Sequence, residues 1–219
     1  FTYTLKDNTK AQNYTIETVF GKLKVTPVTD EIVVTIVGNT KTETYNGKEQ
    51  RVTGYTVTSI SNKLYKSEYI GFTGEAIAKG TDADTYQMGL SEKQFKNISK
   101  NFTNVKFEVT DGSLTINPIA IELTAKSAEK EYDGTPLTDD GYEITSGKFV
   151  EGEGLESVTV EGSQTLVGSS ANTITGYALK TGTKAQNYAI TCKPGTLTVK
   201  DRTTQYEITV KANSGEKVY

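Results

Sequence analysis

The chain repeats itself about every 87 residues, and this period constrains its fold more than any single motif does. The triplet Tyr-Asn-Gly at 45–47 recurs as Tyr-Asp-Gly at 132–134, and Tyr219 falls one period further along. At twice the period, TKAQNYTI at 9–16 matches TKAQNYAI at 183–190. A fixed period indicates units that fold alike and follow one another. The two spacings together indicate that two kinds of unit alternate along the chain.

The ends of the units are marked by a closing pattern, Gly-x-Leu-x-Val/Ile, at 21–25, 112–116 and 195–199. Three closings imply three unit ends, and we expect each complete unit to have an interior of its own. The predicted divisions are the C-terminal part of a preceding repeat at 1–29, a complete repeat at 30–118, a second complete repeat at 119–200, and the N-terminal strand of a following repeat at 201–219.

Within a unit the apolar residues recur every second position, as in a strand with one face on a core. The chain is also rich in threonine and tyrosine, which favour strands. We therefore predict an all-β protein of tandem small β domains in an elongated array, with a sandwich and a β-grasp-like sheet both left open. The matching strand positions are Ile32, Val34 and Ile36; Ile119, Ile121 and Leu123; and Tyr206, Ile208 and Val210.

Glycines in these units predict tight turns. The Asn-Gly and Asp-Gly pairs at 46–47 and 133–134 suit a type I′ hairpin. A second hairpin is expected to join 105–109 to 114–116 through Asp111 and Gly112, with a counterpart over 188–199. In that counterpart, Cys192 should point inward and be inert.

One short helix is predicted near residues 91–100, where the first complete repeat is longer than the second. Ser91 and Gln94 have the spacing of a capping box. Phe95 and Ile98 would form its inward face, with Met88 nearby.

The composition excludes most enzyme classes. The chain has no histidine and a single cysteine, so the usual zinc, haem and Ser-His-Asp sites are absent and no internal disulfide can form. A net charge of only −3 indicates neither nucleic acid nor anionic lipid as a partner. No apolar run approaches the length that spans a bilayer, so membrane insertion of this segment is not expected.

Acidic groups are the main candidates for a site. Tyr132 and Asp133 could belong to a glycosidase carboxylate pair, but their triplet recurs with the fold, which favours a structural turn. Other carboxylates could bind calcium, although the spacing from Asp82 does not match an EF-hand, and solvated loops are the alternative. We therefore predict no catalytic residue, no metal ligand and no cofactor, leaving the ligand unknown. The calcium candidates are Asp82, Asp84, Asp139, Asp140, Glu151, Glu153 and Glu156.

The sequence gives only weak signals for three further kinds of site. A glycan surface would favour exposed tryptophan, which the chain lacks. Sequons at Asn13, Asn97 and Asn101 are explained by chance in so threonine-rich a chain. An internal Lys–Asn amide cross-link is conceivable, but the sequence pairs no partners for it.

The order of these motifs resembles a known family. The Tyr-Asp/Asn-Gly turn, the later NY-x-I or NVKFEV strand, and the closings DGSLTINP, GKLKVTP and GTLTVK are similar to the YDG and MBG tandem repeats of large bacterial, often Gram-positive, cell-surface proteins. The resemblance covers essentially the whole chain. It implies an extracellular, mainly β, serially repeated domain of an adhesin, with no catalytic residues. Asn46 replaces the family's Asp, which the turn tolerates.

These observations predict a structural stalk on a bacterial cell surface, anchored to the wall through regions outside this segment. Pro27 and Pro118 restrict the joints between units, whereas the joint at 200–202 lacks a proline. The expected partners are neighbouring repeats of the same chain, in a monomer. The alternative is an adhesin module that binds a host protein or glycan, which would expose an apolar patch beside 86–104.

Overall fold

The computed structural model of the chain describes residues 2–203, 207–211 and 215. Its regular structure is almost entirely β, which confirms the predicted all-β class. Tyr206 and Tyr219, which the repeat pairs with earlier positions, lie outside the described residues. The helical segments of the described chain are single 3-10 turns: η1 (Ala11–Asn13), η2 (Ser67–Tyr69), η3 (Glu92–Gln94) and η4 (Ala185–Asn187).

Strands β1 to β10 form what we call the first strand group. It contains the sheets β4-β1-β9 and β2-β10-β7 and the pairs β3-β6 and β5-β8. The strands are β1 (Ile32–Gly38), β2 (Thr40–Thr44), β3 (Gln50–Thr53), β4 (Tyr55–Ile60), β5 (Ile70–Phe72), β6 (Ile77–Gly80), β7 (Thr85–Gln87), β8 (Phe95–Asn97), β9 (Val105–Thr110) and β10 (Ser113–Asn117).

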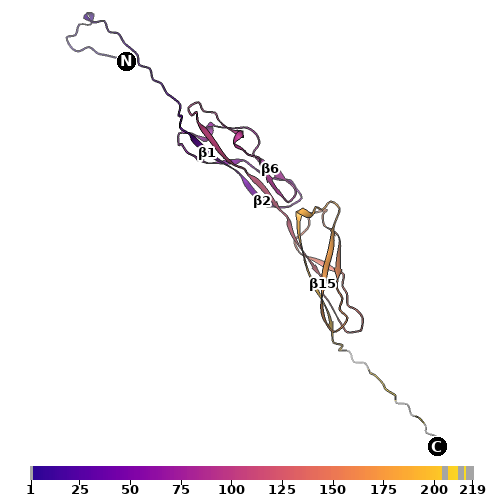
Figure 1. Cartoon of the computed structure of the whole chain (residues 1–219). Coiled ribbons are helices and arrows are strands. Elements are labelled where there is room, and N and C mark those ends of the chain that lie inside the picture. The colour runs from indigo at the N-terminus through magenta and orange to yellow at the C-terminus, as the bar shows by residue number, and fades with distance from the viewer. Residues whose placement is uncertain (1, 204–206, 212–214, 216–219) are drawn as a thin grey trace.

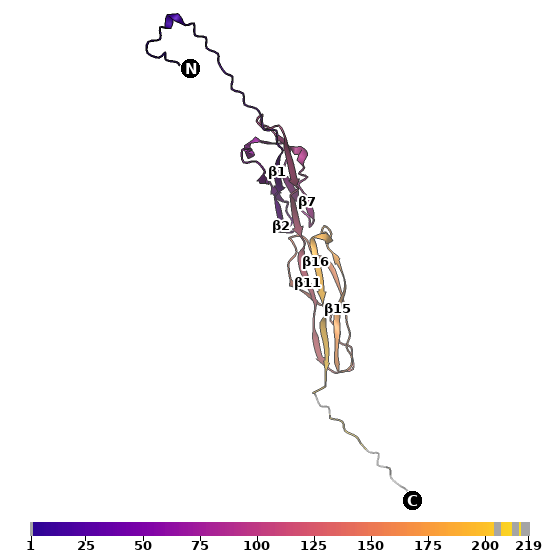
Figure 2. The ribbon, with the colours of Figure 1, turned by 60° about the vertical axis from the view of Figure 1, so that its left-hand side comes forward.

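Strands β11 to β17 form the second strand group, with the sheets β13-β11-β16 and β12-β17-β15-β14. Among the residues that the structure describes, no sheet contains strands of both groups. Figures 1 and 2 show the two groups following one another. The strands are β11 (Ile119–Ala125), β12 (Ala128–Glu131), β13 (Tyr142–Ser146), β14 (Leu155–Glu161), β15 (Gly168–Leu179), β16 (Tyr188–Lys193) and β17 (Gly195–Lys200).

Each group begins and ends with a stretch of two strands that changes sheet midway. In the first group the opening stretch, 32–44, runs parallel to the closing stretch, 105–117: β1 pairs with β9 and β2 with β10. In the second group 119–131 runs parallel to 188–200 in the same way, through β11 with β16 and β12 with β17. Figure 2 shows β11 and β16 next to each other. The chain thus enters and leaves each group along neighbouring parallel strands.

Glycine makes the change of sheet possible, because the opening and closing stretches come into contact there. A Cβ on Gly112 would lie 2.5 Å from the carbonyl oxygen of Asn39, and one on Gly195 would lie 2.5 Å from that of Ala125. Real Cβ atoms do not approach a backbone this closely. The first residue of the closing pattern is therefore glycine because the opening and closing stretches of the chain pack closely against each other there.

The predicted hairpins are wrong. Strands β9 and β10 lie in different sheets, as do β16 and β17, so the glycine between them changes the sheet and does not reverse the strand. The Tyr-Asn/Asp-Gly triplets form turns, but not type I′ turns between paired strands: β2 and β3 belong to different sheets. Among the described residues, Asn8 is the only non-glycine with positive φ, whereas type I′ needs positive φ at both central positions.

The helix expected near 91–100 is reduced to the single turn η3. Its capping box is present as predicted, since Ser91 and Gln94 bond each other's backbone. The chain then enters β8, because Phe95 pairs with Phe72 of β5 and places its ring in the core. Met88 is also buried, but Ile98 is 56% exposed, so the predicted inward helical face is wrong at that position.

One connected cluster contains buried side chains of both groups, whereas two separate interiors were expected; Leu197 and Val199 are buried outside it. The predicted strand faces are confirmed in the two groups, where Ile32, Val34 and Ile36 are buried, as are Ile121 and Leu123. The prediction is wrong further along the chain, because Ile208 and Val210 are exposed. The two interiors meet at the junction of the groups, where Tyr45 packs against Tyr188. The two groups are therefore held together at the junction by side-chain packing as well as by the covalent chain.

Cys192 is exposed, which corrects the prediction that it points inward. It lies on the same face of β16 as Tyr188 and Ile190, but burial falls along that face from Tyr188 to Cys192. The residues that pack on this face of the sheet therefore do not extend to the end of β16.

Candidate functional site at the junction of the strand groups

A carboxylate between two phenols forms the centre of the junction. The hydroxyl of Tyr45 donates to Oε1 of Glu153 at 2.5 Å, and the hydroxyl of Tyr188 donates to Oε2 at 2.7 Å. The amide of Val150 donates to the Tyr188 hydroxyl at 3.0 Å. The two tyrosine rings meet edge to face with their centroids 5.8 Å apart. One glutamate of the second group is thus bonded to a tyrosine from each group.

Both phenols are held in the neutral form. Burial raises the pKa of Tyr45 above its ordinary value, and the bond to Glu153 adds to the effect. Burial also raises the pKa of Tyr188, to about 12. A phenol with a raised pKa is a poor proton donor in chemistry at neutral pH. The arrangement suits hydrogen bonding across an interface.

A second cluster joins η4 to the loop before β7. Lys184 Nζ lies 2.6 Å from Oδ2 of Asp82, and Asn187 Nδ2 donates to Oδ1 of Asp82 at 3.0 Å. The amide of Ala83 donates to Asn187 Oδ1 at 2.7 Å, and Gln186 Nε2 donates to the carbonyl of Ala83 at 3.4 Å. The bonds from Asn187 and Lys184 lower the pKa of Asp82. Asp82 is therefore ionised at neutral pH, and its carboxylate accepts from two donors of the second group, Lys184 and Asn187.

The Tyr-Asn-Gly turn places Tyr45 at this interface. The tyrosine amide donates to the carbonyl of Asn117, and Asn46 Oδ1 accepts from the amide of Lys48. Gly47 has a φ of 75°, and a Cβ there would lie 2.7 Å from Cγ1 of Val150. A side chain at this position would therefore push into the second strand group.

The second copy of the turn has the same shape without such a neighbour. Tyr132 donates its amide to Lys200, and Gly134 has a φ of 81° with open space around it. Asp133 accepts bonds from Lys130 and Thr135, which lower its pKa. Its carboxylate thus stabilises the turn through hydrogen bonds, in agreement with the prediction that this triplet is a structural turn.

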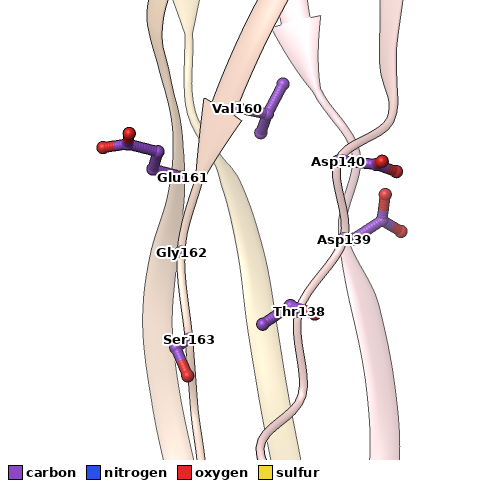
Figure 3. A pocket seen from close by; sticks show the side chains of 7 residues that line it. All are labelled: Thr138, Asp139, Asp140, Val160, Glu161, Gly162 and Ser163. Atoms are coloured by element: carbon purple, nitrogen blue, oxygen red, sulfur yellow. The ribbon is translucent and has the colours of Figure 1, made fainter.

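The remaining calcium candidates do not come together. Among the described residues, no three acidic, histidine or cysteine side chains are placed to hold a metal ion. A hollow of about 960 Å³ is lined by Asp139, Asp140 and Glu161. Figure 3 shows the carboxylates of Asp139 and Asp140 pointing away from Glu161. Asp139 accepts instead from the amide of Gly141 at 2.7 Å.

The sequons occupy three different settings. Asn13 is exposed in η1, whereas Asn97 donates to the carbonyls of Ser99 and Phe102. Asn101 accepts the amide of Val28 on its carbonyl.

From the sequence, Asp82 and Glu153 are predicted only as calcium candidates, and their partners Lys184, Asn187 and Tyr188 are not predicted to lie at a junction. The available signal was the polar repeat TKAQNY, because all six residues recur together although a solvated turn would not require this particular sequence.

Within the described residues, no helix is both long and apolar enough to cross a membrane.

Comparison of the chain with models of protein families, with curated proteins and with solved structures gives no match.

Proposed function

We propose that the chain is a run of structural repeats from the stalk of a bacterial cell-surface adhesin-like protein, which extends a distal functional domain from the cell wall. The repeats are of the YDG or MBG kind and form an elongated array whose complete units are 30–118 and 119–200. The chain is extracellular, performs no reaction, and has its own neighbouring repeats as partners. The observation that carries the proposal is the parallel pairing of the opening and closing stretches in each group.

This pairing suits a load-bearing element. Ile32 pairs with Val105 at one end of the first group, and Thr44 pairs with Asn117 at the other. Tension along the chain pulls residue 32 and residue 117 in opposite directions, parallel to the strands. The hydrogen bonds between the two stretches lie across the strands. They are therefore loaded in shear and together, whereas a pull across the strands would break them one at a time.

The same pairing gives each unit its length. Each opening stretch covers 13 positions, 32–44 or 119–131, and a strand rises about 3.3 Å per residue, so a unit contributes roughly 40 Å along the stalk. The two carboxylates of the junction, Glu153 and Asp82, then limit bending between units. Reach grows with the number of repeats.

Single-molecule pulling tests the proposal in the Cys192→Ser background, which removes the exposed native thiol. One variant carries cysteine handles at the exposed positions Ala120 and Lys200, at opposite ends of the two stretches. The other carries them at Ala120 and Ala189, which are exposed and paired with each other. We expect the first pair to unfold at several times the force of the second. Equal forces would show that the parallel strands bear no load.

Localisation is tested separately. Antibodies against the chain should label intact cells that produce the full-length protein.

The second candidate function is binding of a host protein or glycan. It is favoured by a hollow of about 720 Å³ beside the junction, lined in part by Tyr45, Ile119, Phe149 and Val150. Retention of the chain by host matrix proteins or a glycan array, abolished by Phe149→Ala, would favour this function.

A further inference from the structure

The motif TKAQNY at 183–188 works as a docking turn. Its polar side chains Lys184, Gln186 and Asn187 all bond the two-residue stretch 82–83 of the first strand group. Its tyrosine packs on Tyr45 of that group. Three residues of one short turn therefore supply most of the polar contacts across the junction among the described residues.

The same six letters at 9–14 adopt the same local structure. The turn η1 (Ala11–Asn13) matches η4 (Ala185–Asn187). The amide of Asn13 donates to the carbonyl of Lys10 at 3.0 Å, and that of Asn187 donates to the carbonyl of Lys184 at 3.1 Å. The first copy forms this turn in a stretch that lies apart from both strand groups (Figures 1 and 2). Its shape is therefore set locally and is ready for a partner, which reduces the entropic cost of docking.

The side chains of the first copy lie open to solvent. Tyr14 is 62% exposed, whereas Tyr188 is 6% exposed. The difference continues into the closing pattern, where Leu23 is fully exposed and its counterpart Leu197 is buried. Several exposed apolar side chains in one stretch are typical of a surface that another protein surface covers when the protein functions.

We propose that residues 9–14 are a second docking turn, and that their partner is a further domain of the kind formed by β1–β10. This inference rests on the proposed function, because it takes residues 1–25 as the closing half of a repeat. The partner presents an Asp-Ala stretch, whose carboxylate accepts from Lys10 and Asn13 and whose alanine amide donates to Asn13. It also presents the tyrosine of a Tyr-Asn-Gly turn to Tyr14. Docking turns thus occur once per pair of repeats and set the order in which the two kinds of unit follow one another.

An extended chain tests this inference. Residues 30–174 are fused ahead of residue 1, because position 1 corresponds to position 175 in the repeat and the fusion completes both kinds of unit. Amide hydrogen exchange is then measured residue by residue. We expect protection of the amides at 14–25, and exchange at the added copy of Ala83 at least about tenfold slower than in an open loop, as at the original Ala83.

The variant Lys10→Ala/Asn13→Ala in the extended chain separates docking from folding. It should remove protection from the added copy of Ala83 and leave both the original Ala83 and the strands at 14–25 protected. Lys6→Ala, outside the turn, is the matched control and should change nothing.

Two results would overturn the inference, and they are distinguishable. If 14–25 are protected but the added Ala83 exchanges freely, or is unaffected by the double variant, the docking turn is wrong and the proposed array stands. If 14–25 stay unprotected in the extended chain, residues 1–25 do not close a repeat, and the proposed array fails with the docking turn.

Discussion

At the scale of single residues, Glu153 is the most informative position, because one carboxylate accepts from the hydroxyls of both Tyr45 and Tyr188. In Glu153→Gln only one side-chain oxygen remains as an acceptor, and the charge that strengthens both bonds is lost. We expect the free energy of unfolding to fall by about 1–3 kcal/mol, measured by urea denaturation.

Glu156→Gln is the matched control, since Glu156 is an exposed residue of the same segment. It should change stability by no more than about 0.5 kcal/mol. Equal effects of the two substitutions would mean that the phenol–carboxylate cluster does not stabilise the junction.

At the scale of the elements, the closing pattern provides a test in which the same motif occurs in different surroundings. Gly112→Ala and Gly195→Ala each place a Cβ against the backbone of the opening stretch, which cannot move aside. We expect each to lower the free energy of unfolding by about 1–3 kcal/mol or more. Gly21→Ala, in the same pattern, meets no atom within 4 Å and should be neutral. Thermal unfolding followed by circular dichroism measures all three, and a cost at Gly21 similar to the others would contradict the close-packing argument.

The same elements show what the sequence could and could not predict. The alternation at Ile32–Ile36 and Ile121–Leu123 predicted buried strand faces, because that pattern depends only on the pleat. The glycines of the closing pattern were taken as hairpin turns because tight turns and close chain crossings both require glycine. Only the partner strand distinguishes them, and the partner of β10 is β2, some seventy residues away in the chain. Long-range parallel pairing leaves no local signal.

The junction was harder to predict for the same reason. Asp82 and Lys184 are about a hundred residues apart, and no sequence feature near either residue indicates that the two pair. The spacing of acidic residues suggested metal ligands, whereas in the structure the carboxylates of Asp82 and Glu153 accept hydrogen bonds from other side chains of the protein. The recurrence of a whole polar motif, TKAQNY, was the usable signal, because an exposed turn alone does not require three specific polar side chains.

At the scale of the whole molecule, the packed junction should limit how far the two strand groups bend relative to each other. Spin labels at Ser59 and Ser157, exposed positions in β4 and β14, would report this in the Cys192→Ser background through the spread of their distances. Tyr45→Ala/Asp82→Ala removes one partner from each junction cluster, so we expect a broader spread at neutral pH. Glu156→Ala should leave the distribution narrow.

Acid should loosen the junction of the unsubstituted chain in the same way. The pKa of Asp82 is lowered in the folded state by Asn187 and Lys184, so its contribution is present above the ordinary aspartate pKa of about 4 and is lost as pH falls through the lower folded value. The pair is partly exposed to solvent, so its contribution to stability is small. We therefore expect the distance distribution to be the same at pH 7 and pH 5 and to broaden below about pH 4. In Asp82→Asn, which cannot titrate, this step should disappear, and a broadening that persists there would assign the acid response to other carboxylates.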